Sequence, residues 1–152
     1  MNGKKLKSGV TGANGIATLV LAPNILKAAK AGTKNLVIRF SDSNYNTVSK
    51  TVKIKILKEK TKIFGVNKNF IKSKKIKVYV AYLKDIKGKA VKKALVTLKV
   101  NGKIYKVKTN LKGQAIFKIT KLTKKGKFKA AIKFAGNGYY QLSFRTVLFN
   151  VR

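Results

Sequence analysis

The chain has 152 residues, of which 37 are lysine or arginine and only three are acidic, giving a formal net charge of +34. It contains no cysteine and no histidine, which excludes disulfides, thiol catalysis, zinc–cysteine sites and any mechanism that needs an imidazole. The three acids, Asp42, Glu59 and Asp85, lie far apart in turn-like or linker segments, which argues against paired-carboxylate catalysis and against a calcium or magnesium site. We therefore expect no enzyme, no catalytic or metal-binding residues and no cofactor.

Composition also indicates the class of fold. With 45% hydrophobic residues, 12 glycines and one proline, the sequence can bury a core and suits turn-rich β structure. No apolar run approaches the roughly 20 residues that a membrane helix needs, so we expect no transmembrane segment. The polar start of the sequence does not resemble a signal peptide.

The first segment in chain order is residues 1–57, where short strands and turns are predicted. Asn-Gly pairs at 2–3 and 14–15 are typical of tight turns, because glycine and asparagine accept positive φ. Residues 22–32 predict a short helix capped by Asn24 and ending near Gly32, most simply an elaborated surface loop. Alternation then predicts a final strand from Thr47 to Leu57. Its expected inward residues are Val52, Ile54 and Ile56, between the outward Lys53 and Lys55.

Residues 58–62, of sequence KEKTK, are predicted to be a charged linker, and residues 63–152 a complete second domain. About seven strands are expected there. One runs from Ser73 to Lys84, and we expect its inward face to carry Ile76, Val78, Val80 and Tyr82.

The strongest local signal is Asn101-Gly102 between two alternating segments, which predicts a β-hairpin with a type I′ turn. Pairing across the turn places Leu98 opposite Tyr105 and Val96 opposite Val107 on one apolar face. The opposite face should carry Lys99, Ile104, Lys106 and Lys108. A second turn at Asn110–Gly113 leads to the inward residues Ala115, Phe117 and Ile119, and residues 128–134 alternate again.

Much of this pattern occurs twice. Residues 1–56 match residues 100–151 at offsets of 94 to 99 residues, shown by paired landmarks such as Gly15 with Gly113, Gly32 with Gly126, and Tyr45 with Tyr139. The spacing is that of one β-sandwich domain. We therefore predict immunoglobulin-like β-sandwich repeats, one complete and one truncated at its N-terminal side. The truncated copy should leave an exposed sheet edge, a site for strand addition or a strand-exchange dimer.

The amino-acid sequence of residues 85–103, 109–119 and 136–140 resembles the Ig-like repeats of large adhesin-like cell-surface proteins of methanogenic archaea and bacteria. The resemblance covers residues 61–152 and, more weakly, residues 1–57. It implies a non-catalytic stalk or adhesive repeat at the cell surface, next to neighbouring repeats of a longer array. The family brings no catalytic residues with it.

The lysines alternate with apolar residues along nearly every strand, and only Arg39, Arg145 and Arg152 are arginine. This indicates either a solvated outer coat or a surface that binds anionic wall or surface polymers, with nucleic acid bound only non-specifically. The alternative function is a cationic nucleic-acid-binding β-barrel, which would need a concentrated lysine stripe with exposed aromatic residues. We expect Tyr82 and Tyr105 to point inward, and Tyr45 and Tyr139 to bond the nearby turn backbone as in a tyrosine corner.

A Lys–Asn isopeptide crosslink is a further possibility that abundant lysine and asparagine raise. It would need a buried acid to move protons, and only Asp42 and Asp85 could serve. Both look like turn residues.

Overall fold

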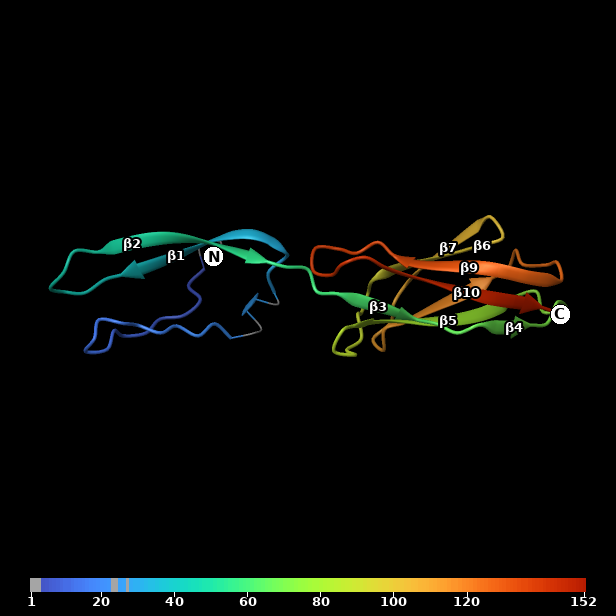
Figure 1. Cartoon of the computed structure of the whole chain (residues 1–152), viewed down its shortest axis with the longest axis horizontal. Helices are drawn as coiled ribbons and strands as arrows, with labels where there is room; N and C mark the ends of the chain where they lie inside the picture. Colours follow the sequence, from blue (N-terminus) through green and yellow to red (C-terminus); the bar gives the residue numbers. More distant parts are fainter. Residues whose placement is uncertain (1–3, 23–24, 27) are drawn as a thin grey trace. The chain divides into compact units, whose positions relative to one another are not determined.

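The computed structural model describes residues 4–22, 25–26 and 28–152, and the chain divides into two units, Met1–Lys58 and Glu59–Arg152. Figure 1 shows the described strands along the chain. The boundary differs from the expected linker at residues 58–62. Thr61 already begins strand β3 (Thr61–Phe64), and the backbone of Glu59 exchanges two hydrogen bonds of 2.8 Å with Tyr139 and Gln141. Most of this charged segment is therefore part of the second unit.

The second unit is a sandwich of two sheets in the described part of the chain. Three strands form one sheet in the order β3-β5-β8, and five form the other in the order β4-β10-β9-β6-β7. The bounds not yet given are β4 Lys68–Phe70, β5 Lys77–Asp85, β6 Leu95–Val100, β7 Lys103–Lys108, β8 Gln114–Ile119, β9 Gly126–Phe134 and β10 Ser143–Val151. Figure 1 shows β3 and β5 on one side of this unit and β6, β7 and β9 on the other.

The strand order of the sandwich is that of an immunoglobulin-like domain. β5 and β8 share one sheet, while β6, β9 and β10 form the centre of the other with β7 added at its edge, which corresponds to strands B and E against C, F, G and C′. Pairing is antiparallel except between β4 and β10, which run parallel. The predicted fold class is confirmed, because the described strands form two separate sheets and not the closed barrel of the alternative.

The hydrophobic core lies entirely within this second unit. Leu98, Ile132 and Phe149 from the five-stranded sheet and Phe117 and Leu83 from the three-stranded sheet are at most 1% exposed. All the buried apolar residues lie between 63 and 151, whereas no described residue of the first unit is buried. Burial of apolar area is the main favourable term in folding, so most of the stabilising energy belongs to the second unit.

The hairpin predicted at Asn101-Gly102 is confirmed. Leu98 pairs with Tyr105 and Val96 with Val107, as the alternation indicated. Asn101 and Gly102 have φ values of 47° and 71°, the two positive angles that a type I′ turn requires. The expected inward residues Ala115, Phe117 and Ile119 of β8 are also buried.

The face predicted for β5 is wrong. Tyr79, Ala81 and Leu83 are the buried residues, and Val78 and Tyr82 are 49% and 38% exposed. Ile76, also expected inward, is exposed before the strand begins. Both faces of this strand carry apolar side chains, so a shift by one residue exchanges two plausible inward sets.

The inward face of β5 begins with a charged residue, Lys77. This lysine is only 3% exposed, but its ammonium group donates hydrogen bonds to the backbone oxygens of Lys74 at 2.7 Å and Lys72 at 3.4 Å. The hydrocarbon stem thus packs inside while the charge is met by carbonyl groups at the sheet end.

The first unit contains a two-stranded sheet of β1 (Gly32–Phe40) and β2 (Val48–Ile56). Ile54 and Ile56 are half-buried and Val52 is 38% exposed, so the predicted inward set shares one face without being enclosed. The expected helix includes residues 24 and 27, which lie outside the described residues. The expected turn at residues 2–3 lies wholly outside them.

The hairpin β1–β2 has the same length and register as β9–β10. Gly32 pairs with Ile56 as Gly126 pairs with Val151, and both glycines have positive φ, 128° and 134°. The turns also match. The N–H of Gly12 donates to the carbonyl of Ile16, as the N–H of Asn110 donates to that of Gln114. The N–H of Gly15 donates to the carbonyl of Gly12, as the N–H of Gly113 donates to that of Asn110.

Candidate functional site

The side chains of two of the three acids bond the backbone of turns. Asp85 is 6% exposed, and its Oδ1 accepts the N–H groups of Lys87 at 2.9 Å and Lys89 at 2.8 Å. Asp42 accepts the N–H of Asn44 at 2.8 Å in an exposed turn. These bonds fix loop conformation through side-chain capping. Within the described residues, no group of three or more acids is placed to hold a metal ion.

Two acids nonetheless lie close enough to Tyr140 to act on its hydroxyl. Burial raises the pKa of the Tyr140 hydroxyl above its usual value, and the negative charges of Glu59 and Asp85 raise it further. Sequence spacing gave no sign of this proximity, because β3 and β5 bring the two acids together only after pairing Thr61 with Asp85.

The geometry of an isopeptide crosslink is not present around the buried lysine. Lys77 and Asp85 occupy the two ends of β5, which places them roughly 27 Å apart at the rise of an extended strand. The ammonium of Lys77 is bonded to backbone carbonyls instead.

The tyrosines that tie their hydroxyl groups to backbone differ from those predicted. The hydroxyl of Tyr79 donates to the carbonyl of Val66 at 3.0 Å, and that of Tyr105 accepts the N–H of Lys121 at 3.0 Å. Tyr105 packs against the core as expected. Tyr82 points outward, and Tyr139 and Tyr45 are 39% and 70% exposed, so the expected corner role passes to Tyr79 and Tyr105.

The outer side of the five-stranded sheet gathers lysines from three neighbouring strands. We call this surface the lysine face; its members are Lys99, Lys106, Lys108, Lys127, Lys129 and Lys133, all exposed. Thr97 pairs with Lys106 on one side and with Lys133 on the other, so these three side chains form one row across the sheet. Each lysine of the lysine face pairs with an uncharged residue on the adjacent strand, as Lys99 does with Ile104, so the like charges are spaced across the sheet and do not lie directly opposite one another.

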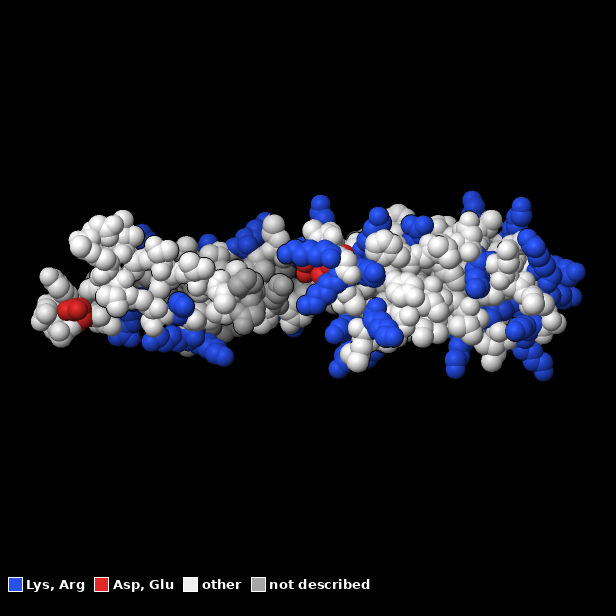
Figure 2. All heavy atoms as spheres, turned by 90° about the horizontal axis from the view of Figure 1, so that it is seen from below, with Lys and Arg blue, Asp and Glu red and all other residues white. Residues whose placement is uncertain are grey.

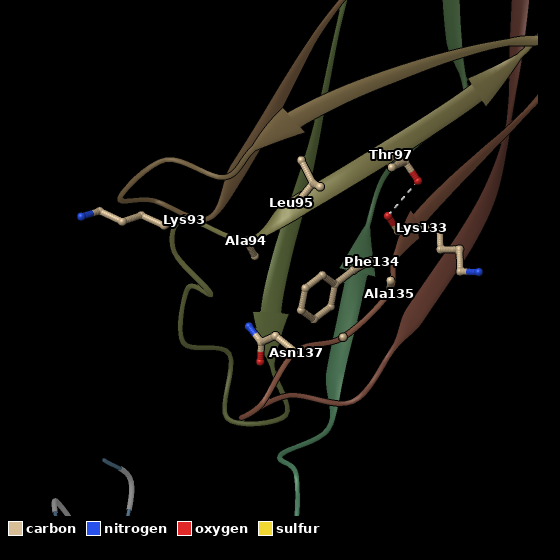
Figure 3. Close-up of a pocket in the computed structure, with 9 residues that line it drawn as sticks. Lys93, Ala94, Leu95, Thr97, Lys133, Phe134, Ala135 and Asn137 are labelled. Carbon is tan, nitrogen blue, oxygen red and sulfur yellow. Dashed lines mark hydrogen bonds between the residues drawn. The ribbon is translucent and has the colours of Figure 1, made fainter. Parts of the chain in front are cut away.

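A shallow hollow of about 470 Å³ lies at one end of the lysine face. Its lining includes Leu95, Thr97 and Phe134, with Lys93 and Lys133 at the sides. Figure 3 shows both lysine side chains pointing away from the hollow, and the Thr97 hydroxyl bonded to the backbone oxygen of Lys133 at 3.3 Å. With no acid or other ionisable group pointing into it, the hollow offers apolar contact next to positive charge and no catalytic group.

Comparisons with known proteins find similarity in structure only. No protein-family model matches the sequence, and no curated protein matches it. Among solved structures, the CARDB domain of a Pyrococcus furiosus protein is 20% identical with a TM-score of 0.40, covering 60% of this chain and 92% of that chain.

Two further similar structures come from ice-binding adhesins. A bacterial immunoglobulin-like domain of the M. primoryensis adhesin is 13% identical with a TM-score of 0.38, covering 62% of this chain and 98% of that chain. A Ca²⁺-stabilised adhesin of an Antarctic bacterium is 16% identical with a TM-score of 0.37, covering 92% of this chain and 36% of that chain.

The strand order defines the class of the second unit as an immunoglobulin-like sandwich. The prominent feature of its surface is the positive charge of the lysine face. No helix in the described part of the chain is both long and apolar enough to cross a membrane.

Proposed function

We propose that this chain is a non-catalytic segment of immunoglobulin-like repeats from a cell-surface adhesin-like protein, serving as spacer and as weak electrostatic adhesion module. The observation that carries the proposal is the lysine face, six exposed lysines on three adjacent strands of a rigid sheet. Its partner is an anionic wall or surface polymer, held by release of counterions. The sequence resemblance to adhesin repeats supports the surface location.

The proposed module is part of a tandem array. The matching register of β1–β2 and β9–β10, and the matching turns at Gly12–Gly15 and Asn110–Gly113, support two copies of one unit. Its mechanism is mechanical and electrostatic, because a sandwich holds the cationic surface rigidly at a distance set by the number of repeats.

The test is the binding of fluorescent polygalacturonate to the full chain at increasing salt. Changing Lys99, Lys106 and Lys133 to alanine should weaken binding at low salt and flatten its salt dependence by roughly two to three logarithmic units per decade of salt. The matched control removes the same charge from loops, as Lys72→Ala, Lys112→Ala and Lys121→Ala. Equal effects of the two triple variants would mean that charge and not the lysine face sets binding.

Nucleic acid remains the competing partner. The same titration with duplex DNA fragments of two lengths tests it, and we expect weak binding that disappears near physiological salt. Tight, length-dependent binding at that salt would replace adhesion with nucleic-acid binding as the function.

We also propose that β1 and β2 accept a further strand. Among the described residues each pairs only with the other, and Leu36, Ile54 and Ile56 are half-buried rather than enclosed. Strand addition would supply both hydrogen bonds and apolar cover. Light scattering of the full chain should show a dimer that forms as concentration rises, and a monomer at all concentrations would contradict strand exchange.

A further inference from the structure

The outer side of the three-stranded sheet is unusually apolar for an exposed surface. We call it the aromatic face; its floor is formed by Phe64, Val78, Val80, Tyr82 and Ile116. Four of these are between 38% and 49% exposed, and Val80 is half-buried. Figure 2 looks onto the side of the second unit where β3 and β5 lie in Figure 1, and shows an uncharged area with lysines around it. Contiguous exposed apolar surface is typical of a binding site.

The register shows that this floor is continuous. Phe64 pairs with Tyr82, and Val80, two residues before Tyr82, pairs with Ile116. Neighbouring strands lie about 4.8 Å apart and successive outward residues about 7 Å apart. The floor is therefore a flat strip across three strands.

Polar groups lie at one edge of the strip. The side-chain amide of Gln114 donates to the hydroxyl of Tyr82 at 3.3 Å, and its oxygen accepts from the amide of Asn110 at 2.8 Å. The hydroxyl hydrogen of Tyr82 can therefore donate outward, so the strip offers both donors and acceptors beside an apolar surface.

Lysines stand at both ends of the strip. Lys62 pairs with Lys84, and their ammonium groups lie 5.4 Å and 5.8 Å from the centre of the Phe64 ring. At the other end Lys118 pairs with Val78. The two ends are about 20 Å apart along β5. No acid points outward from these three strands, because Asp85 is buried.

Charge decides which class of partner fits. A second copy seated on this face would bring Lys62, Lys84 and Lys118 against the same lysines, which disfavours self-association through this face. We infer that the aromatic face binds an acidic polysaccharide, with the C–H faces of its sugar rings on the apolar strip, hydroxyl groups at Tyr82 and Gln114, and carboxylates at Lys62, Lys84 and Lys118. The inference rests on the proposed function, since both assign an anionic polymer as partner.

A single-stranded nucleic acid fits this face less well. Its bases stack on successive aromatic rings, but here only Phe64 and Tyr82 are aromatic, and Val78, Val80 and Ile116 are aliphatic. Aliphatic side chains pack against the C–H faces of sugars without needing aromatic overlap. An acidic peptide would satisfy the lysines but has no requirement for a flat floor.

The experiment separates this face from the lysine face by salt. In 1 M NaCl the Debye length falls to about 3 Å, which removes most long-range attraction. We expect polygalacturonate to keep measurable binding to the full chain at this salt. Changing Phe64 and Tyr82 together to serine should lower that residual affinity about tenfold or more, because apolar contact contributes most of it. The loss should be absent from the Lys99, Lys106 and Lys133 triple variant.

Poly-L-glutamate and oligo-dT of matched charge are the comparison probes. Both should lose binding in 1 M NaCl. Retained binding of either at the level of polygalacturonate would overturn the assignment to a polysaccharide. Residual polygalacturonate binding that is unchanged in the double serine variant, or absent from the unmodified chain, would overturn the role of the aromatic face.

Chemical-shift mapping keeps the test independent of variant stability. Adding polygalacturonate to the unmodified chain in 1 M NaCl should shift the amide signals of Val80, Tyr82 and Ile116, with little change at Thr97 and Lys133. The reverse pattern would contradict the inference. The proposed function fails separately, if the lysine-face variant binds normally at low salt.

Discussion

Thr109 is one of three buried polar or charged residues among those described, at 3% exposure. Its hydroxyl donates to the carbonyl of Val91 at 2.7 Å and accepts the N–H of Ala94 at 2.9 Å. It thereby satisfies two buried backbone groups on a segment 15 to 18 residues away in sequence. Buried polar groups without partners are costly.

We predict that Thr109→Val, which keeps the side-chain shape, lowers the free energy of unfolding by about 1–3 kcal/mol. Thr109→Ser, which retains the hydroxyl, should lose less. Urea unfolding of the full chain, followed by tyrosine fluorescence, measures both. Equal stability of the valine variant and the unmodified chain would show that the two hydrogen bonds contribute nothing.

The ionisation of the Tyr79 hydroxyl makes the free energy of unfolding depend on pH. Burial raises the pKa of this hydroxyl above 10.0, although the positive charge of Arg145 acts in the opposite direction. A raised pKa in the folded state means that folding disfavours the phenolate. The contribution to stability is complete below pH 10 and is lost as pH rises through the raised pKa.

We expect the free energy of unfolding to fall more steeply in the unmodified chain than in Tyr79→Phe as pH rises above about 10. Lysine titration affects both proteins alike, so the difference between them reports on Tyr79. Tyr140 should add a slope of the same sign in both proteins, because its pKa is also raised. Parallel pH profiles for the two proteins would contradict the prediction.

At the scale of elements, local turn chemistry was the most informative part of the sequence. The two-residue turn Asn101-Gly102 sets the register of the strands on either side of it. Leu98 pairs with Tyr105 as this register requires. β5 has no such constraint. Its inward side was decided by long-range packing of Tyr79 on Phe149, at 4.7 Å between ring centres, and by a lysine whose charge is bonded at the sheet end. Alternation alone could not reveal either contact.

The candidate surfaces were accessible from sequence to different degrees. The outward lysines of β6 and β7 follow from the hairpin register. The aromatic face does not, because alternation along the strand predicts Val78, Val80 and Tyr82 to point into the core. The proximity of Glu59 and Asp85 also depends on β3 pairing with β5, a contact between segments about 20 residues apart that no local pattern encodes.

The two matched hairpins make a controlled comparison within one chain. β1–β2 and β9–β10 share length and register, yet Ala130, Ile132 and Phe134 of β9 are buried while no described residue of β1 is. A two-stranded sheet without cover is marginally stable. Amide hydrogens of β1–β2 should therefore exchange at least about a hundredfold faster than those of β9–β10.

Hydrogen exchange followed by mass spectrometry at low protein concentration measures this difference. If added chain or higher concentration slows exchange in β1–β2 alone, that result supports strand addition. Equal protection of the two hairpins at low concentration would contradict the view that burial, and not the shared register, sets their stability.

At the scale of the whole molecule, repulsion among 37 cationic side chains opposes the folded state. We expect the free energy of unfolding to rise by on the order of 1 kcal/mol as NaCl increases from about 10 mM to 0.5 M, because salt screens this repulsion. The Lys106→Glu, Lys133→Glu variant should show a smaller rise, since it places acids beside the remaining lysines of the lysine face. Urea unfolding at several salt concentrations measures both.

The parallel pairing of β4 with β10 bears on how the second unit would respond to being stretched. Phe70 pairs with Val151, and Asn67 accepts the backbone N–H of Leu148 through its side chain at 2.8 Å. When Glu59 and Arg152 are drawn apart, these two strands slide against each other, so their hydrogen bonds bear the force together and do not open one by one. We expect Asn67→Ala to lower the rupture force in single-molecule pulling, and an unchanged force would contradict this role. The pairing of β10 with β4 would then be the contact that resists mechanical unfolding of the sandwich.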